Sequence, residues 1–293
     1  MKAAYARHTR RRFLYNAIAV GMGTPFLAAS TVEATSSVDR PLYVPPEEAP
    51  HELTFMQWPV NRTVHPDGDF LDHLQQTIAA IANAISSYEP VVMLADRHHH
   101  PAAHRLLSNR VTLWDIPTDD LWCRDSGPLF AVHRGGELVV SHIQFNGWGD
   151  KQVHTQDARI AERAAQRLNL PLMLARLVGE AGGVEHDGHG LLLAHESSWV
   201  NQNRNPGLQK NEIEDRLLAT YGAKRMIWSR GVYGQHITDY HIDSLARFTG
   251  RNRVLMNLPS RVLADDPFHQ AALATRNRLF LRALKWTLFM SRA

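Results

Sequence analysis

Apolar residues in this chain recur with two periods, one typical of helices and one typical of short buried strands. Residues 70–86 repeat their apolar positions at helical spacing and predict a helix, as do residues 157–168 and 210–221. Gly222 follows the last of these and is expected to cap its C-terminus. Short apolar runs predict strands, which cover residues 53–59, 91–95, 111–116, 138–144, 190–195, 225–229 and 253–258.

The predicted elements follow an order of strand, strand, helix and strand that returns at intervals of about 50 to 60 residues, without a repeat in the sequence itself. This order predicts a compact α/β domain but does not specify which α/β fold the chain adopts. The last residues, 280–293, keep a basic and apolar pattern that indicates a helix.

The first 34 residues have the three parts of an export signal. Residues 10–12 form a twin-arginine pattern, a short apolar stretch follows over residues 17–29, and a small-residue cleavage site ends at Ala34. We therefore expect residues 1–34 to be a twin-arginine signal peptide read by the Tat export machinery, and the mature protein to be periplasmic. A disordered basic tail is the alternative interpretation. Residues 35–51 predict a linker, and residues 52–293 the folded domain.

The signal segment accounts for the positive net charge of the chain. It contains five of the 32 Lys and Arg residues and one of the 29 Asp and Glu residues, so the rest of the chain has a net charge of −1. A chain without an overall positive field is not expected to bind nucleic acid. No segment approaches the roughly 18 apolar residues of a membrane-spanning helix, so we expect no membrane span. The sequence does not indicate an oligomeric state.

Candidate chemistry centres on residues 234–248, where Asp239, His241 and Asp243 alternate along the chain. In an extended segment, His241 and Asp243 share a face, which places a general acid/base beside an anionic anchor. Such a face suits a cationic substrate. Two other stretches, residues 122–128 and 180–183, bring further charged groups, although each stretch alone is explained by a buried ion pair or by turn chemistry.

Together these stretches suit the binding of a guanidinium group. A guanidinium presents five donors in a planar fork, which paired carboxylates both satisfy and neutralise. Asp125 and Asp243 would clamp this group from two sides. His241 would protonate the leaving ammonia and activate water, and Trp122 would lie against the planar cation.

Several motifs in this order and spacing resemble the agmatine deiminase and bacterial peptidylarginine deiminase family of guanidine-modifying enzymes. The resemblance extends from about Leu53 to Asp266. The matching residues are Gln57-Trp58-Pro59, Trp122-Cys123-Arg124-Asp125-Ser126-Gly127-Pro128, Phe145-Asn146-Gly147-Trp148-Gly149, Glu180-Ala181-Gly182-Gly183, Asn203-Arg204-Asn205-Pro206 and Thr238-Asp239-Tyr240-His241-Ile242-Asp243.

The resemblance implies a fold and a reaction. The fold is a pentein-type α/β propeller with five blades of ββαβ units and a site on its central axis. The reaction converts a guanidine group to a ureido group plus ammonia through a covalent cysteine thiouronium, with no metal or organic cofactor. By resemblance, Asp125 and Asp243 anchor the guanidinium, His241 is the general acid/base, Trp122 forms a wall of the pocket, and Glu180 lies close to the site.

The sequence departs from the family at its C-terminus, because the family's nucleophilic cysteine lies in a Gly-rich segment that we do not find here. We therefore expect a chain truncated at its C-terminus, with an incomplete last propeller blade and without turnover. Cys123 is the only cysteine. A neighbouring carboxylate raises the pKa of a thiol, so we expect Cys123 to be a small buried residue and not a nucleophile.

A second departure concerns Tyr240, which stands where the family has glycine. If that position requires a positive φ, the tyrosine is strained by about 1–2 kcal/mol. Two functions of other classes also remain open. A non-catalytic guanidinium-binding protein would use the same carboxylates without turnover, and a metal-dependent hydrolase would use His241, Asp243, Asp125 and Glu180 as ligands.

Overall fold

The computed structural model describes residues 42–133, 135–251, 253–281 and 285–291. The predicted signal peptide, residues 1–34, lies outside the described residues, as does the first part of the predicted linker.

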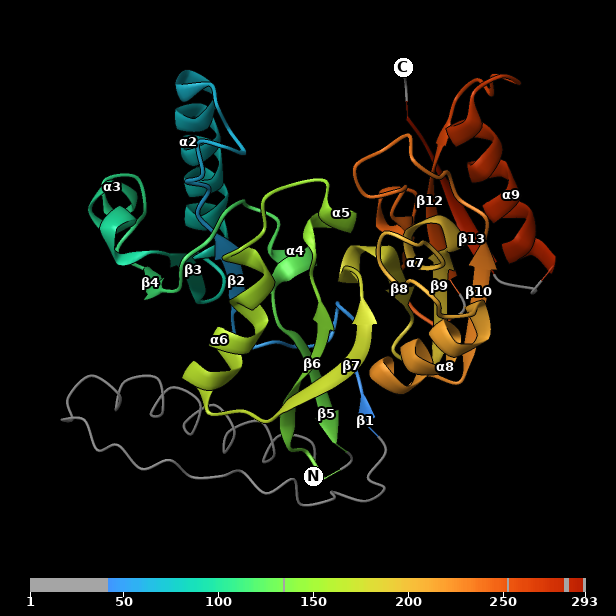
Figure 1. The fold of residues 1–293 in the computed structure, drawn as a ribbon, viewed down its shortest axis with the longest axis horizontal. Coiled ribbons are helices and arrows are strands. Elements are labelled where there is room, and N and C mark those ends of the chain that lie inside the picture. Colours follow the sequence, from blue (N-terminus) through green and yellow to red (C-terminus); the bar gives the residue numbers. More distant parts are fainter. Residues whose placement is uncertain (1–41, 134, 252, 282–284, 292–293) are drawn as a thin grey trace.

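The described elements are short strands alternating with helices, arranged from one end of the molecule to the other in nearly chain order (Figure 1). The strands are β1 Leu42–Tyr43, β2 Thr54–Gln57, β3 Val91–Ala95, β4 Val111–Asp115, β5 Leu129–His133, β6 Leu138–Gln144, β7 Leu172–Val178, β8 Val184–His186, β9 Leu191–His195, β10 Arg225–Ser229, β11 Ala246–Phe248, β12 Arg253–Pro259 and β13 Lys285–Ser291. The α-helices are α2 Gly68–Ile85, α3 His100–His104, α4 Cys123–Ser126, α5 Gly147–Asp150, α6 Ile160–Leu168, α7 Glu196–Trp199, α8 Lys210–Tyr221 and α9 Pro267–Leu281. The 3₁₀ turns are η1 Arg97–His99, η2 Asp157–Arg159, η3 Ala181–Gly183 and η4 Ile242–Ser244.

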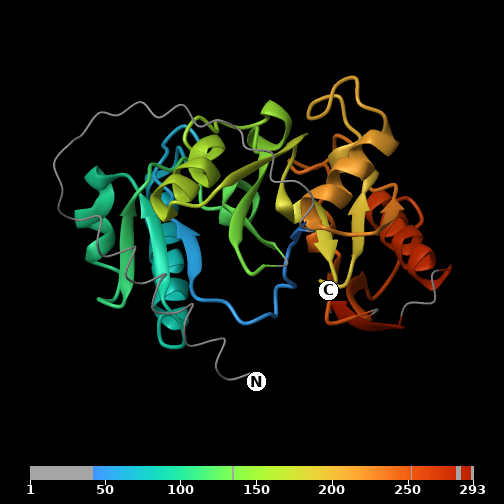
Figure 2. The same cartoon turned by 90° about the horizontal axis from the view of Figure 1, so that it is seen from below.

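Three successive units share one topology. In each, two antiparallel strands are followed by a helix and by a third strand parallel to the second: β5-β6-α6-β7, β8-β9-α8-β10 and β11-β12-α9-β13. These are the ββαβ units that the order of predicted elements and the family resemblance led us to expect. Seen from below, the three units again follow one another from green to red (Figure 2).

The first sheet departs from this topology, because its strands β2, β3 and β4 are all parallel. The last unit, in contrast, contains both antiparallel strands, the helix and the final parallel strand. The described residues form four sheets, one fewer than the five blades that the resemblance implies, and the sheet of atypical topology is the first.

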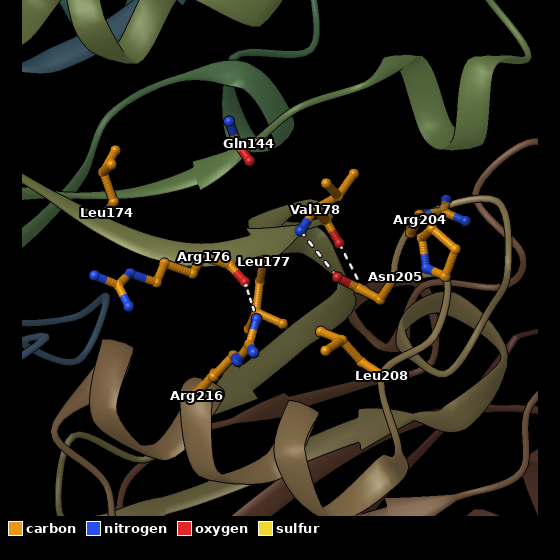
Figure 3. Close-up of a pocket in the computed structure, with 10 residues that line it drawn as sticks. Gln144, Leu174, Arg176, Leu177, Val178, Arg204, Asn205, Leu208 and Arg216 are labelled. Carbon is orange, nitrogen blue, oxygen red and sulfur yellow. Dashed lines mark hydrogen bonds between the residues drawn. The ribbon is translucent and has the colours of Figure 1, made fainter.

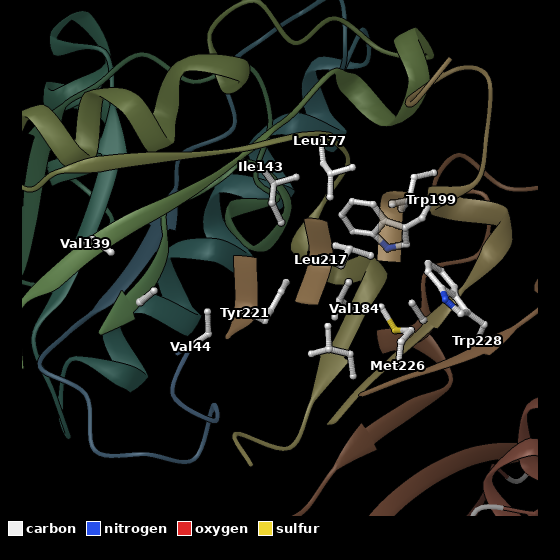
Figure 4. Close-up of a cluster of buried hydrophobic side chains, with 14 residues drawn as sticks. Val44, Val139, Ile143, Leu177, Val184, Trp199, Leu217, Tyr221, Met226 and Trp228 are labelled. Atoms are coloured by element: carbon white, nitrogen blue, oxygen red, sulfur yellow. The ribbon is translucent and has the colours of Figure 1, made fainter. Parts of the chain in front are cut away.

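The main core joins the β5-β6-α6-β7 unit to the β8-β9-α8-β10 unit. Figure 4 shows Ile143 and Leu177 of the second sheet close to Leu217 of α8 and to Trp199, and all four side chains are buried. Helix α8 ends as its sequence predicts, since Gly222 adopts φ 64° and its N–H bonds back to Leu218 and Ala219 carbonyls. Packing between neighbouring sheets therefore fixes the position of the loops that connect them.

Two predictions about the chain ends differ from the structure. Within the predicted linker, β1 pairs with β5 and Val44 packs in the main core, so residues 42–44 belong to the folded domain. Residues 285–291, inside the predicted C-terminal helix, form strand β13 parallel to β12. In both cases the segment becomes a strand because it pairs with a strand that is distant in the sequence. A local pattern of apolar residues does not predict such pairing.

Candidate functional site

Three side chains from separate segments meet at one glycine, Gly182 in η3. A Cβ atom at Gly182 would lie 2.6 Å from Asp125 Oδ1, 2.7 Å from His241 Nδ1 and 2.8 Å from Asp243 Oδ2. Atoms of a real side chain do not approach so closely, so only glycine leaves room for this arrangement. The structure thus brings together the three residues that the sequence singled out as anchors and acid/base.

Asp125 is held by donors from two other segments. Trp148 Nε1 donates to Asp125 Oδ2 over 2.9 Å, and the Gly182 N–H donates to Asp125 Oδ1 over 3.2 Å. Burial raises the pKa of Asp125, and Glu180 adds to the rise, whereas His241 and the two donors oppose it. Residues 123–126, which include Asp125, form the single helical turn α4, so this segment is not extended.

His241 lies between two carboxylates. Its Nε2 is 3.1 Å from Glu180 Oε2, and its Nδ1 is 3.8 Å from Asp125 Oδ1. Burial opposes protonation of the ring, but Asp125 and Glu180 outweigh it and raise the pKa of His241. The ring is therefore poised to carry a proton, as a general acid requires.

Asp243 reaches the same point through a tight turn. His241 precedes the 3₁₀ turn η4, which contains Asp243, so the extended segment that we predicted here is wrong. The shared face is nevertheless formed, since both side chains contact the space above Gly182. Burial raises the pKa of Asp243 while His241 opposes the rise.

A buried arginine supports the acid/base from behind. Arg204 Nε donates to both carboxylate oxygens of Glu180 over 3.0 Å, and Arg204 Nη1 donates to Asp239 Oδ2 over 2.7 Å. The side chains are 0%, 1% and 1% exposed, respectively. Sequence reasoning quoted Arg204 only as part of a matching stretch and assigned it no role. Because the buried Arg204 guanidinium holds the Glu180 carboxylate in place, that carboxylate keeps its orientation toward His241.

The turn before His241 has an unfavourable backbone. Asp239 adopts φ 55° and Tyr240 φ 66°, which confirms the positive φ that we suspected at Tyr240. For a tyrosine this conformation costs about 1–2 kcal/mol. Two donors compensate at the aspartate, because Lys151 Nζ and Arg204 bind the Asp239 carboxylate and, against the effect of burial, lower its pKa.

Trp122 and Cys123 play smaller parts than their neighbour Asp125. Trp122 is 53% exposed, and the indole that contacts Asp125 is instead that of the buried Trp148. Burial, with a contribution from Asp157, raises the pKa of Cys123 to about 12. The Cys123 sulfur is therefore a neutral thiol at physiological pH, which is unsuited to nucleophilic attack.

A cleft of about 390 Å³ lies beside β7, but Asp125, His241 and Asp243 do not line it. Figure 3 shows its floor, where Asn205 bonds to both the N–H and the C=O of Val178, over 3.1 and 2.9 Å. The Arg176 side chain points away from that of Arg216, so the two do not form a joint anion site (Figure 3). The cleft instead shows how Asn205 fixes the end of β7, two residues before Glu180.

The electrostatic balance of the site favours one bound cation. Asp125, Asp243, Glu180 and Asp239 supply four carboxyl groups, whereas Arg204 and Lys151 are the permanently charged cations that contact them. These cations leave two carboxyl groups unbalanced, which a guanidinium between Asp125 and Asp243 and a proton on His241 would together neutralise. Among the described residues, no group of three or more His, Cys, Asp or Glu side chains is arranged to hold a metal ion. No helix in the described part of the chain is long and apolar enough to cross a membrane.

The fold and this carboxylate-flanked histidine define a class of hydrolases that act on the C–N bonds of guanidine groups. Residues 43–284 match the Porphyromonas-type peptidyl-arginine deiminase family, and the chain belongs to that family.

Curated relatives agree with this assignment. The chain is 33% identical over 248 residues to a Streptomyces coelicolor protein named "Putative agmatine deiminase", covering 83% of this chain and 71% of that one. It is 32% identical over 231 residues to a protein of the same name from Legionella pneumophila, covering 78% of this chain and 66% of that one. The chain thus spans about two thirds of the length of these relatives.

Solved structures show the same fold. The agmatine deiminase of Enterococcus faecalis superimposes with a TM-score of 0.76 at 24% identity, covering 85% of this chain and 71% of that one. A C. jejuni agmatine deiminase with substrate bound gives a TM-score of 0.76 at 22% identity, covering 85% and 74%. The pentein-type α/β propeller that the sequence resemblance implied is confirmed.

Proposed function

We propose that this chain binds the guanidinium group of agmatine or of an arginine side chain between Asp125 and Asp243, with His241 as the general acid/base of deimination. The observation that carries this proposal is the meeting of these three side chains at Gly182, each less than 3 Å from the missing Cβ. The buried contact of Arg204 Nε with Glu180 supports it, because it orients the Glu180 carboxylate toward His241, whose pKa Glu180 helps to raise.

The proposed reaction converts the guanidine to a ureido group and releases ammonia. A cysteine thiolate attacks the guanidinium carbon, His241 gives its proton to the departing ammonia, and water activated by His241 then releases the product from the thiouronium. Cys123 does not supply that thiolate, since the pKa of its buried thiol is raised to about 12. We therefore propose that the 293-residue chain binds guanidinium compounds without turning them over.

Calorimetric titration with agmatine tests the binding. The wild-type chain is expected to bind, and Asp243→Asn to bind about 10- to 100-fold more weakly, because one charge-assisted contact is lost. Cys123→Ser is the matched control and should bind as the wild type does. Absence of heat with the wild-type chain at millimolar agmatine would refute guanidinium binding.

An assay for ammonia and ureido product tests the second part. We expect neither product from the purified chain. Product formation that disappears in Cys123→Ser would overturn the assignment of Cys123 as an inert thiol. Product that persists in Cys123→Ser would instead show that the reaction does not require a cysteine of this chain.

A further inference from the structure

The residue that directly precedes the acid/base has a conformation that its own side chain disfavours. Tyr240 follows Asp239 in the left-handed region, and two such residues in succession form a turn that L-amino acids rarely adopt without outside support. His241 begins where this turn ends. The direction of its ring therefore depends on whatever holds residues 239 and 240.

Two side chains of one short segment hold the carbonyls of this turn. Ser197 Oγ donates to the Asp239 carbonyl over 2.6 Å, and His195 Nδ1 donates to the Tyr240 carbonyl over 2.8 Å. Both donors are fully buried. Space for them exists because Gly231 has no side chain: a Cβ there would lie 2.1 Å from Ser197 Oγ and 2.8 Å from His195 Cβ.

His195 also holds the side chain of Tyr240. The imidazole stacks on the phenol ring with centroids 4.7 Å apart and an angle of 28°, and Phe268 of α9 meets the phenol edge-on at 5.0 Å. Glycine at position 240, as in the resembling family, could make neither ring contact. The ring contact with His195 is therefore made by the same residue, Tyr240, whose positive φ strains the backbone.

The other nitrogen of His195 is anchored to the last unit. Nε2 is 3.1 Å from Thr275 Oγ1 of α9, which in turn lies 2.8 Å from Ser229 Oγ of β10. Burial lowers the pKa of His195 to about 4, so its ring is neutral at physiological pH. A carbonyl only accepts, so Nδ1 must carry the proton. In the neutral ring Nε2 is then an acceptor, and it shares the single proton of the Thr275 hydroxyl with the Ala271 carbonyl, which lies 2.9 Å from Thr275 Oγ1.

We propose that His195 is a positioning residue for the guanidinium site: as a neutral, Nδ1-protonated imidazole it holds the left-handed Asp239–Tyr240 turn and so aims His241 at Glu180 and Asp125. The proposal rests on the role proposed above for His241. It adds a residue that contacts neither the guanidinium anchors nor the reacting atoms, and that acts only through the backbone carbonyl and the ring of Tyr240.

Nitrogen-15 NMR of the ligand-free chain tests the tautomer. His195 is expected to stay neutral and Nδ1-protonated between about pH 5 and about pH 8. An Nε2-protonated ring, or a ring that titrates in that range, would contradict the proposal. This measurement needs no ligand, so it remains decisive even if agmatine binding fails and the proposed function falls.

Three variants then separate positioning from simple stability. His195→Asn keeps an N–H close to where Nδ1 donates, His195→Leu removes both hydrogen bonds, and Thr275→Val removes only the bond on the far side of the ring. We expect His195→Leu to weaken agmatine binding about tenfold, the effect of one neutral hydrogen bond, and His195→Asn to restore most of it. Thr275→Val should unfold more easily yet bind agmatine as the wild type does.

The pKa of His241 provides a readout in the same variants without ligand. It should fall in His195→Leu, because the ring no longer lies firmly between Asp125 and Glu180, and it should stay unchanged in Thr275→Val. Equal losses of affinity and equal shifts of this pKa in His195→Leu and Thr275→Val would show that His195 only stabilises the fold, and would overturn the proposal.

Discussion

Two clusters of charged side chains adjoin the candidate site, and they differ in exposure. The inner cluster consists of Arg204, Glu180, Asp239 and Lys151, and its arginine and the Glu180 and Asp239 carboxylates are at most 1% exposed. The outer cluster consists of Glu47, Arg124, Arg247 and Glu185. Glu47 pairs with both arginines, and Arg247 Nε lies 3.1 Å from Glu185 Oε1.

The difference in exposure predicts a difference in role. In the outer cluster Glu47 is 53% exposed and both arginines are 40% exposed, so water competes with the two pairs that Glu47 makes and screens them, whereas Glu185 is 8% exposed. In the inner cluster the carboxylates of Glu180 and Asp239 are shielded from water, so water cannot replace their contacts with Arg204. The Arg204 guanidinium must therefore face both carboxylates with a fixed geometry. An ion pair can therefore orient a catalytic histidine when it is buried, whereas an exposed pair of the same chemistry mainly links segments of the surface.

The largest expected effect is that of Arg204→Met. This change leaves two buried carboxylates without their fork, and such uncompensated charges typically cost about 3–5 kcal/mol of folding free energy. Urea unfolding of the two proteins measures the loss, and Arg124→Met provides the matched control in the outer cluster. A loss below about 1 kcal/mol for Arg204→Met would show that burial does not distinguish the two clusters.

A smaller effect is expected for Glu180→Gln, which keeps the shape of the side chain but removes its charge. Glu180 helps to raise the pKa of His241, so this pKa should fall in the variant. A histidine with a raised folded-state pKa contributes stability below its unfolded pKa and loses that contribution as the pH rises through the folded value. In Glu180→Gln this loss should therefore occur at lower pH.

NMR titration of the His241 ring measures the effect, and urea unfolding at several pH values measures its consequence. Glu47→Gln is the control from the outer cluster and should leave the pKa of His241 unchanged. An unchanged pKa in Glu180→Gln would mean that Asp125 and Asp243 raise the pKa of His241 without Glu180, and the inner cluster would lose its assigned role.

The sequence predicted most of the regular structure because the relevant signals are local. The helix that ends at Gly222 and the strands around residues 91–95 and 225–229 were predicted from periodicity and capping, and the structure confirms them. Strands β1 and β13 were not predicted, since each depends on a partner strand far away in the chain. Local pattern carries no information on such pairing.

The site was predicted in part for a similar reason. Asp125, His241 and Asp243 are identifiable by residue type and spacing, but the local segments are turns, and the extended chain that we assumed around His241 is not formed. Arg204 and Trp148 stand in matching stretches, yet only the folded chain shows which carboxylate each contacts. His195 carries no sequence signal, because its partner Tyr240 lies 45 residues away.

The smallest effect is expected for Glu47→Gln, the change that removes the shared carboxylate of the outer cluster. Both arginines that pair with Glu47 are partly exposed, so water can solvate them when the carboxylate is lost, and Arg247 keeps its contact with Glu185. We expect a loss of at most about 1 kcal/mol, which shrinks further when salt screens the remaining charges. Urea unfolding at low and high ionic strength measures both quantities. A loss of folding free energy as large as that of Arg204→Met, or one that salt does not reduce, would show that Glu47 anchors the segment before β2 as firmly as Arg204 anchors the site. Exposure alone would then not determine how much an ion pair contributes to stability here.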